Sequence, residues 1–229
     1  MSEKSRPTVL GRLCSLYESV AIRTEVVGAE NLPRQGPAVI IANHTSMVDP
    51  IMLLGLLGRL GLHAGPKLRF VASEIVFNSK LTRGLVQGAG MIPAGFRRAS
   101  PESVRPVLTA LERDEMVLLY PEGDVQSTSD GAPRKFRPGI AWVLEKIAVP
   151  VIPLAHHDAR VVSDGRVPQV ALRGATAIVR RPHWAVVIGQ PIQPSEWAPA
   201  ERERILTVLS ERLTQVWQQA RDLANKSAS

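Results

Sequence analysis

Residues 37–60 read PAVIIANHTSMVDPIMLLGLLGRL, in which an apolar run, a short polar segment and a second apolar run follow one another. The first run, 37–43, is short and rich in Val and Ile, which is typical of a strand buried on both faces. The second run, from Met47 to Leu60, is long enough for a helix and has a proline near its start, where proline is tolerated. A buried strand that leads into a helix is the repeating unit of an α/β fold.

The same alternation continues along the chain. Further short apolar runs predict strands, namely RFVAS (69–73), MIPA (91–94), MVLLY (116–120), VPVIPLA (149–155) and WAVVIG (184–189). Helices are predicted between and after them at 74–87, 101–113, 137–147 and 199–223. We therefore predict an α/β fold with a largely parallel or mixed central sheet flanked by helices. In such a sheet, active residues gather where the strands end.

The composition is that of one soluble α/β domain. The 229 residues are 45% hydrophobic and 21% charged, without an internal repeat or a low-complexity linker. We divide the chain into an N-terminal amphipathic segment (1–22), the α/β domain (23–198) and a C-terminal helix with a short tail (199–229). Cys14 is the only cysteine, so a disulfide framework and a multi-cysteine zinc site are excluded, and a reducing, cytosolic setting fits.

The chain is strongly basic. Its net charge of +7 favours anionic partners, which include nucleic acid, phospholipid headgroups, coenzyme A and an acidic carrier protein. Aromatic residues make up only 4% of the chain, and no segment interleaves them with Lys or Arg, as single-stranded nucleic-acid binders do. We therefore expect an anionic membrane surface or a phosphate-bearing co-substrate, and no nucleic acid.

The N-terminal segment has no continuous apolar region of the secretory type, and no stretch reaches the roughly 18 apolar residues of a spanning helix. Contact with a bilayer would therefore be peripheral. Apolar residues at helical spacing form a stripe with Arg6, Arg12 and Arg23 nearby: Val9, Leu10, Leu13, Leu16, Tyr17 and Val20. The spacing supports two interpretations equally, a helix lying in the lipid headgroups and a helix packed on the core.

The polar segment between the two opening runs carries His44 and Asp49 at the end of a predicted strand. Five residues apart on a regular helix, they would point about 140° away from each other. If the helix begins at Ser46 and His44 precedes it, the carboxylate can turn back to the imidazole and make it a general base. A helix-capping interpretation is equally open, because Ser46-x-x-Asp49 resembles a capping box with Pro50 in the first turn.

Two more polar clusters follow predicted strands. Residues 120–124 read YPEGD, in which an acidic residue between Pro and Gly can bind an acceptor group or form a plain turn. Arg97 and Arg98 follow the predicted strand at 91–94, where two guanidinium groups can grip a phosphate or simply lie at the surface. His156 and His157 also follow a strand, so one of them can approach the site, although we expect both to be solvated. With Asp158 they could form a zinc site, which we do not expect, because adjacent histidines usually point apart.

Other enzyme classes lack their signatures. The chain contains no Gly-x-Ser-x-Gly elbow of a serine hydrolase and no Gly-x-x-x-x-Gly-Lys-Ser/Thr phosphate loop. Gly88-Ala89-Gly90 is only a fragment of a dinucleotide fingerprint, and it precedes a predicted strand rather than a helix.

Taken together, the clusters resemble one family. NHTSMVDP (43–50) resembles the His-x4-Asp motif of the 1-acylglycerol-3-phosphate and glycerol-3-phosphate acyltransferases, and YPEG (120–123) resembles their Phe-Pro-Glu-Gly motif. FRPG (136–139) is similar to the Phe-Lys-x-Gly segment that follows, and VIPL (151–154) to the apolar block after it. The motifs occur in the family's order, and the resemblance spans residues 22–193.

The resemblance implies acyl transfer from coenzyme A or acyl carrier protein to the hydroxyl of a lyso-lipid, without a covalent intermediate, a metal or another cofactor. It implies that His44 is the base, that Asp49 orients it, and that Glu122 with Gly123 places the acceptor. Substrate-binding roles fall to the other residues of the clusters: Asn43, Arg97, Arg98, Tyr120, Pro121, Phe136, Arg137 and Gly139. Thioester attack also needs N–H donors for an oxyanion, which we expect from Gly95 or Gly123. The implied location is cytoplasmic, on the inner face of the membrane.

The chain departs from the family pattern where phosphate is bound. Asp124 and Val125 stand where Thr and then Arg or Asn are common, and Arg97 falls one position late. A carboxylate at Asp124 repels phosphate unless it is paired or turned away. We therefore expect lysophosphatidate to be used no better than some other lyso-lipid. The alternatives are a non-lipid hydroxyl or amine acceptor, or a basic membrane- or carrier-binding protein that has lost turnover.

Overall fold

The computed structural model describes residues 8–63, 68–73, 77–78, 80, 83–94, 101–125, 130–164, 167–197 and 201–227. Its strands are β1 (Arg23–Val27), β2 (Ala38–Ala42), β3 (Leu68–Ser73), β4 (Ile92–Ala94), β5 (Met116–Leu119), β6 (Val151–His156) and β7 (His183–Ile188). Its α-helices are α1 (Val9–Ala21), α2 (Asp49–Arg59), α4 (Arg83–Gly88), α5 (Pro101–Glu112), α6 (Gly139–Leu144), α7 (Val167–Arg180) and α8 (Arg202–Lys226). Short 3-10 helices are η1 (Ala29–Asn31), η2 (Ala159–Val161) and η3 (Pro194–Glu196).

The strands form one seven-stranded sheet in the order β1-β7-β6-β2-β5-β3-β4. Neighbouring strands are parallel except β6 and β7, which are antiparallel. The predicted α/β fold with a largely parallel or mixed sheet is therefore confirmed. Because β2 lies between β5 and β6, the residues that follow these three strands meet at one edge of the sheet.

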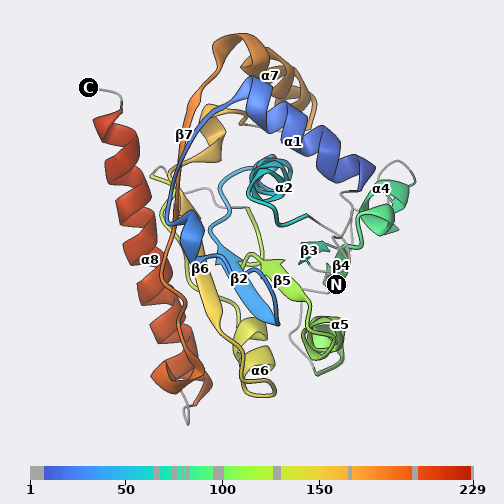
Figure 1. Cartoon of the computed structure of the whole chain (residues 1–229), viewed down its shortest axis with the longest axis vertical. Helices are drawn as coiled ribbons and strands as arrows, with labels where there is room; N and C mark the ends of the chain where they lie inside the picture. The colour runs from blue at the N-terminus through green and yellow to red at the C-terminus, as the bar shows by residue number, and fades with distance from the viewer. Residues whose placement is uncertain are drawn as a thin grey trace.

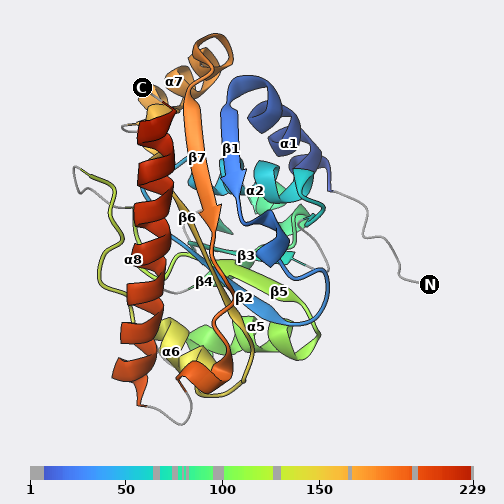
Figure 2. The same cartoon turned by 60° about the vertical axis from the view of Figure 1, so that its left-hand side comes forward.

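Both faces of the sheet are covered (Figure 1). Strand β2 is fully buried, and its side chains alternate between two cores. Ile40 belongs to the core beneath α1, α2 and α7, whereas Val39 and Ile41 belong to the core beneath α5, α6 and α8. This two-sided burial explains the uninterrupted apolar run in the sequence. Figure 2 shows the long helix α8 lying along β6 and β7.

Helix α1 packs against α2 with almost no side chain between the two backbones. A Cβ atom on Gly55 would lie 2.4 Å from the carbonyl oxygen of Cys14. The inner face of α1 also carries Glu18, which is fully buried and forms an ion pair with Arg59 of α2. The stripe predicted in this segment is divided: Leu10 and Tyr17 are half-buried and pack against the core, whereas Leu13 and Leu16 are 58% and 61% exposed. The core-packing interpretation therefore does not hold for these two leucines.

Most predicted elements have counterparts, with shifted ends. Helix α2 begins at Asp49 rather than at Ser46, because the preceding residues form a turn. The predicted helix at 74–87 lies partly outside the described residues, and α4 covers its end. Strand β1 and helix α7 were not predicted. No helix among the described residues has both the length and the apolarity to cross a membrane.

Candidate active site

The loop after β2 brings His44 and Asp49 together. His44 lies in the non-helical segment before α2, and Asp49 is the first residue of that helix. The imidazole Nδ1 lies 2.8 Å from the Asp49 Oδ2, and the Asp49 side chain is fully buried. The carboxylate therefore accepts the Nδ1 proton, which leaves Nε2 with the lone pair that a general base needs.

Backbone groups hold the Asp49 carboxylate in place. Its Oδ2 also accepts the backbone N–H of Thr45 at 2.6 Å and that of Ser46 at 3.0 Å. The Ser46 hydroxyl in turn donates to the carbonyl oxygen of Ser163 at 2.6 Å. Asp49 thus shapes the turn before the helix and contacts His44 with the same oxygen. The predicted capping box is not formed, because the helix N-cap is Val48 and has no side-chain hydrogen bond; only the bond from the Ser46 N–H to Asp49 matches it.

Glu122, from the segment that follows β5, is buried behind the loop. One carboxylate oxygen accepts the N–H of His44 at 3.1 Å, and the other accepts the N–H of Arg134 at 3.1 Å. Burial raises the pKa of the Glu122 carboxyl to about 8, although the hydrogen bonds from Arg134 and His44 act to lower it. In this structure Glu122 fixes two loops, and its predicted contact with the acceptor stays a prediction.

The FRPG segment packs against the YPEG segment. The N–H of Arg137 donates to the carbonyl oxygen of Pro121 at 2.8 Å, and its Nε donates to the carbonyl oxygen of Glu122 at 3.1 Å. Gly123 has a φ of +74°, and a Cβ there would lie 2.5 Å from the Arg137 side chain, so glycine is required. Phe136 is buried in the core, and Gly139 begins α6.

Gly123 does not offer the oxyanion donor that we expected from it. Its N–H donates to the carbonyl oxygen of Tyr120 at 3.0 Å and closes the turn after β5. Gly95 lies outside the described residues, as do Arg97 and Arg98, so their roles in oxyanion and phosphate binding stay predictions. Asp124 is exposed, and its carboxylate accepts the N–H of Val125 at 2.8 Å.

His156 was expected to be solvated, and that expectation is wrong; the alternative, that one of the two histidines approaches the site, holds for His156. The side chain is fully buried at the end of β6, beside Asn43. Asn43 is also fully buried, and its predicted role in substrate binding gives way to contacts within the protein, because its amide bonds the backbone of His156. The only sequence signal was that both residues follow strands that turn out to be neighbours. His157 is only half-buried.

The metal alternative rests on His156, His157 and Asp158. Asp158, its predicted carboxylate, forms a bidentate ion pair with Arg160. Among the described residues, no group of three His, Cys, Asp or Glu side chains is placed to hold a metal ion.

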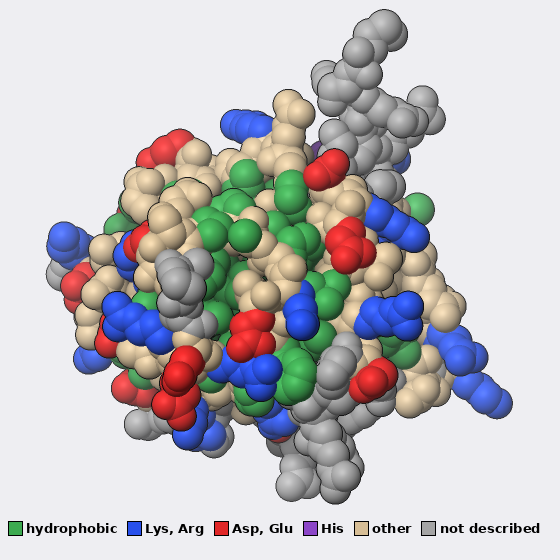
Figure 3. All heavy atoms as spheres, turned by 90° about the horizontal axis from the view of Figure 1, so that it is seen from below, with side chains coloured by type: hydrophobic (Ala, Val, Ile, Leu, Met, Phe, Trp, Pro, Cys, Tyr) green, Lys and Arg blue, Asp and Glu red, His purple; other side chains and the backbone are tan. Residues whose placement is uncertain are grey.

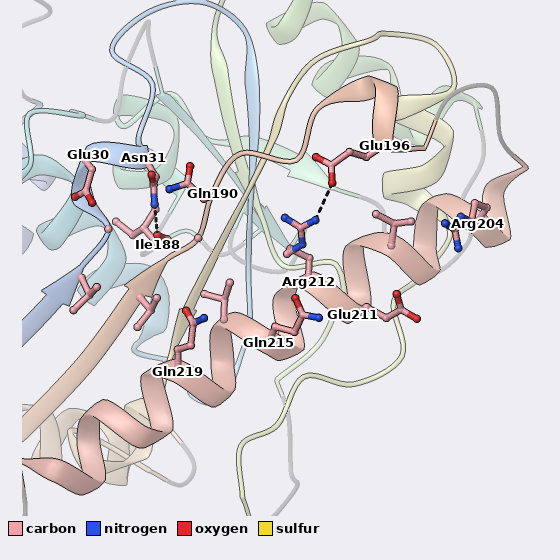
Figure 4. Close-up of a pocket in the computed structure, with 16 residues that line it drawn as sticks. Glu30, Asn31, Ile188, Gln190, Glu196, Arg204, Glu211, Arg212, Gln215 and Gln219 are labelled. Carbon is pink, nitrogen blue, oxygen red and sulfur yellow. Dashed lines mark hydrogen bonds and ion pairs between the residues drawn. The ribbon is translucent and has the colours of Figure 1, made fainter.

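The cavity in Figure 4, of about 640 Å³, lies apart from this loop. It opens between α8 and the ends of β1 and β7, and Gln190, Gln215 and Gln219 point toward it. Since β7 runs antiparallel to β6, its end lies away from His156. No lining residue belongs to the predicted motifs. The cavity is therefore not part of the candidate active site.

Comparison with known proteins matches most of the chain to one family. The family described as Acyltransferase matches residues 23–157. A chloroplastic 1-acyl-sn-glycerol-3-phosphate acyltransferase of Arabidopsis thaliana is 25% identical over 193 residues, which cover 80% of this chain and 49% of that protein. This chain therefore spans about half the length of that relative. A 1-acyl-sn-glycerol-3-phosphate acyltransferase of Bacillus subtilis is 23% identical over 203 residues, which cover 88% of each chain.

A solved structure has the same fold. The crystal structure of the 1-acyl-sn-glycerophosphate acyltransferase of Thermotoga maritima aligns with a TM-score of 0.68 at 18% identity. The alignment covers 93% of this chain and 79% of that one.

Proposed function

The chain belongs to the acyltransferase family, and we propose that it moves a fatty acyl group from a thioester to the hydroxyl of a lyso-lipid. The observation that carries the proposal is the contact of 2.8 Å between the imidazole of His44 and the fully buried carboxylate of Asp49. An intact pair of this kind favours an enzyme over a scaffold that only binds. The donor is acyl coenzyme A or acyl carrier protein, and no other cofactor is needed.

In the proposed reaction, Nε2 of His44 removes the proton from the acceptor hydroxyl as its oxygen attacks the thioester carbonyl. A carbon–oxygen bond forms, and the carbonyl oxygen becomes an oxyanion. Asp49 stabilises the imidazolium through Nδ1. When the tetrahedral species collapses, the carbon–sulfur bond breaks, and the thiolate takes the proton from Nε2. The imidazole returns to its starting state without a covalent enzyme intermediate.

For the acceptor we propose a lyso-lipid with an anionic headgroup, such as 1-acylglycerol-3-phosphate. The names of the relatives in Arabidopsis thaliana and Bacillus subtilis support this class. Arg134 and Lys135 are exposed, and the N–H of Arg134 bonds the carboxylate that also holds His44, so positive charge lies near the loop. Exposed Asp124 introduces a negative charge next to the YPEG segment. We therefore retain the expectation that 1-acylglycerol-3-phosphate is not preferred over every other lyso-lipid.

We place the enzyme on the cytoplasmic, inner face of a membrane, as a peripheral protein. The outward face of α1 is apolar, with Val9, Leu13, Leu16 and Val20 all at least 46% exposed. Helix α7 lies beside α1, because the Tyr17 hydroxyl donates to the carbonyl oxygen of Gly174 at 2.8 Å, and both helices lie at the same end of the molecule (Figures 1 and 2). Leu172 and Val179 of α7 are 69% and 88% exposed.

The charges on this pair of helices suit an anionic lipid surface. Helix α7 contains no acidic residue, and Glu18, the one acidic residue of α1, is buried. Arg12 and Arg173 are exposed there. By contrast, the face seen from below carries acidic and basic side chains interspersed around apolar ones (Figure 3). Apolar side chains flanked by cations are typical of a protein surface that lies in the headgroup region.

The experiment measures release of free thiol from palmitoyl coenzyme A, with and without a panel of lyso-lipids. His44→Ala should lower acceptor-dependent release by about 10² to 10⁴ fold, the usual contribution of a positioned base. His157→Ala is the matched control, since this half-buried neighbour makes no contact with the dyad among the described residues, and it should retain full activity. Equal activity of His44→Ala and the parent would refute the mechanism. Turnover only with acyl carrier protein would identify the donor.

A further inference from the structure

Asn43 and His156 are joined by three hydrogen bonds in the interior. The Asn43 amide donates to the backbone carbonyl of His156 at 3.0 Å and accepts the backbone N–H of His156 at 3.0 Å. The third bond uses the side chain of His156 and the backbone of Asn43: the imidazole Nε2 lies 3.1 Å from the backbone carbonyl oxygen of Asn43. Since a carbonyl oxygen only accepts, Nε2 carries the proton.

That carbonyl belongs to the peptide group that precedes the proposed base. The peptide unit between Asn43 and His44 has its C=O bonded by His156 and its N–H bonded by the Glu122 carboxylate at 3.1 Å. The two bonds come from the ends of β6 and β5, on either side of β2. The peptide plane is thus held at both of its polar atoms, and the direction in which the His44 side chain leaves the backbone is fixed with it.

His156 also lies next to Asp49. Its Nε2 is 3.7 Å from the same Oδ2 that His44 contacts. Burial lowers the pKa of His156 below its ordinary value, although Asp49 and Asp158 act to raise it, so the imidazole stays neutral at neutral pH. A neutral ring at this place donates a hydrogen bond and does not compete with His44 as a second cation for Asp49.

Packing alone does not account for a histidine here. The Nδ1 atom of His156 is buried and has no hydrogen-bond partner among the described residues. Burying an unpaired polar atom costs free energy, and an apolar side chain would fill the same space without that cost. The other ring nitrogen, Nε2, does have a partner, and its hydrogen bond holds the loop that carries the dyad.

We propose that His156 is a positioning residue for the acyl-transfer reaction, which holds the Asn43–His44 peptide and so keeps the imidazole of His44 aligned with Asp49. The proposal rests on the function proposed above. It predicts that the position of the donor on residue 156 matters, and not only its polarity. A displacement of about 1 Å in such a group can lower the rate by about 10²-fold.

A matched pair of variants tests the placement. In His156→Gln the amide nitrogen reaches the position of Nε2 and can donate to Asn43, whereas in His156→Asn the shorter side chain cannot. We expect kcat to fall by about 10- to 100-fold in His156→Asn and to be largely recovered in His156→Gln. KM for palmitoyl coenzyme A and for the acceptor should stay within about twofold in both. His157→Gln and His157→Asn are the controls and should leave kcat unchanged.

The outcomes separate this role from a general effect on folding. Equal kcat in His156→Gln and His156→Asn, or a loss that appears only in KM, would overturn the proposal. Nitrogen-detected NMR of the His44 ring provides a readout that does not need turnover. The Nδ1–H signal should change in His156→Asn and persist in His156→Gln. If the parent protein shows no transfer activity while this NMR contrast holds, the proposed function fails and the positioning role of His156 stands.

Discussion

The ring of Tyr120 stacks on the imidazole of His44, with centroids 4.1 Å apart and planes inclined by 17°. The imidazole is therefore held by the Asp49 carboxylate at Nδ1 and by an aromatic ring on its face. Tyr120 itself is 7% exposed, and its hydroxyl has no hydrogen-bond partner among the described residues. The ring, and not the hydroxyl, is what this position contributes.

Replacing Tyr120 by Phe should therefore leave kcat within about twofold of the parent and raise the free energy of unfolding by about 1 kcal/mol, because it removes a buried, unpaired hydroxyl. Tyr120→Leu, which removes the stack, should lower kcat. Urea denaturation and the thiol-release assay measure the two effects. A loss of activity in Tyr120→Phe as large as that in Tyr120→Leu would show that the hydroxyl takes part in the reaction.

Asp49→Asn tests the charge of the dyad. The amide keeps the size of the carboxylate but removes the charge that stabilises the imidazolium, so kcat should fall by about 10² to 10⁴ fold. The backbone N–H groups of Thr45 and Ser46 still need an acceptor in the turn, and the amide oxygen can supply one. The variant should therefore fold, as circular dichroism would show. A fully active Asp49→Asn would contradict the role given to the carboxylate.

The sequence allowed the dyad to be predicted because its two residues lie in one short segment between a strand and a helix. The contacts that complete the site are not local. His156 lies 113 residues from Asn43, and no periodicity in the sequence pairs them. The capping alternative could not be excluded from the sequence either, because it depends on where the helix begins, and the structure shows that it begins at Asp49 with Val48 as its N-cap.

There are physical reasons why two elements were not predicted. Strand β1, with the sequence RTEVV, is an edge strand whose residues are exposed or half-buried, so it lacks the apolar run that marked the other strands. Helix α7 contains Gly174 in its interior, which disfavours a helix, and tertiary contact with α1 overrides that preference. The exposure of the apolar stripe on α1 depends on which face meets α2, and spacing alone does not show that.

The raised pKa of Glu122 predicts a pH dependence of stability. The folded carboxyl titrates at about 8, whereas its ordinary value is 4.5, so between these values the folded state binds more protons than the unfolded state. The contribution of this group to the free energy of unfolding is fully present below pH 4.5 and is lost as the pH rises to about 8. Glu122→Gln has no titrating group at this position, so its stability should not show this decrease with pH. Urea denaturation of both proteins between pH 5 and pH 9 measures the difference between their free energies of unfolding, which should level off above about pH 8.

A constant stability difference between the parent and Glu122→Gln across this range would contradict the assignment. The variant is expected to be less stable at low pH, because its amide cannot accept both N–H groups that the carboxyl oxygens accept. The titration is therefore reported by how the difference in free energy of unfolding varies with pH, and not by the size of that difference at one pH.

The outward residues of α1 and α7 predict where the protein meets lipid. Leu13→Ser with Leu16→Ser, and separately Leu172→Ser with Val179→Ser, should each weaken sedimentation with phosphatidylglycerol vesicles by about tenfold, because apolar area is withdrawn from the headgroup region. These side chains are more than half exposed, so the fold should be unaffected. Val27→Ser, at an exposed residue of β1, is the control and should bind as the parent does.

Deletion of residues 1–22 would be a poor test of the same idea. It removes Glu18 and leaves Arg59 and the surface of α2 at Gly55 without their partners, so it should destabilise the domain as well as remove the stripe. If the paired serine variants sediment with vesicles as strongly as the parent protein, the two helices are not the lipid-binding face.

The hydrogen bonds between Asn43 and His156 span 113 residues, and they also set an order of events during synthesis. His44 leaves the ribosome early, but the partner that holds its peptide group does not exist until β6 has been made and has paired with β2. Closing so long a loop is entropically costly and slow compared with forming local helices. A nascent or partly assembled chain therefore carries every atom of the dyad while the peptide group before His44 is still unheld, and the proposed catalytic competence arrives only once β6 has paired with β2.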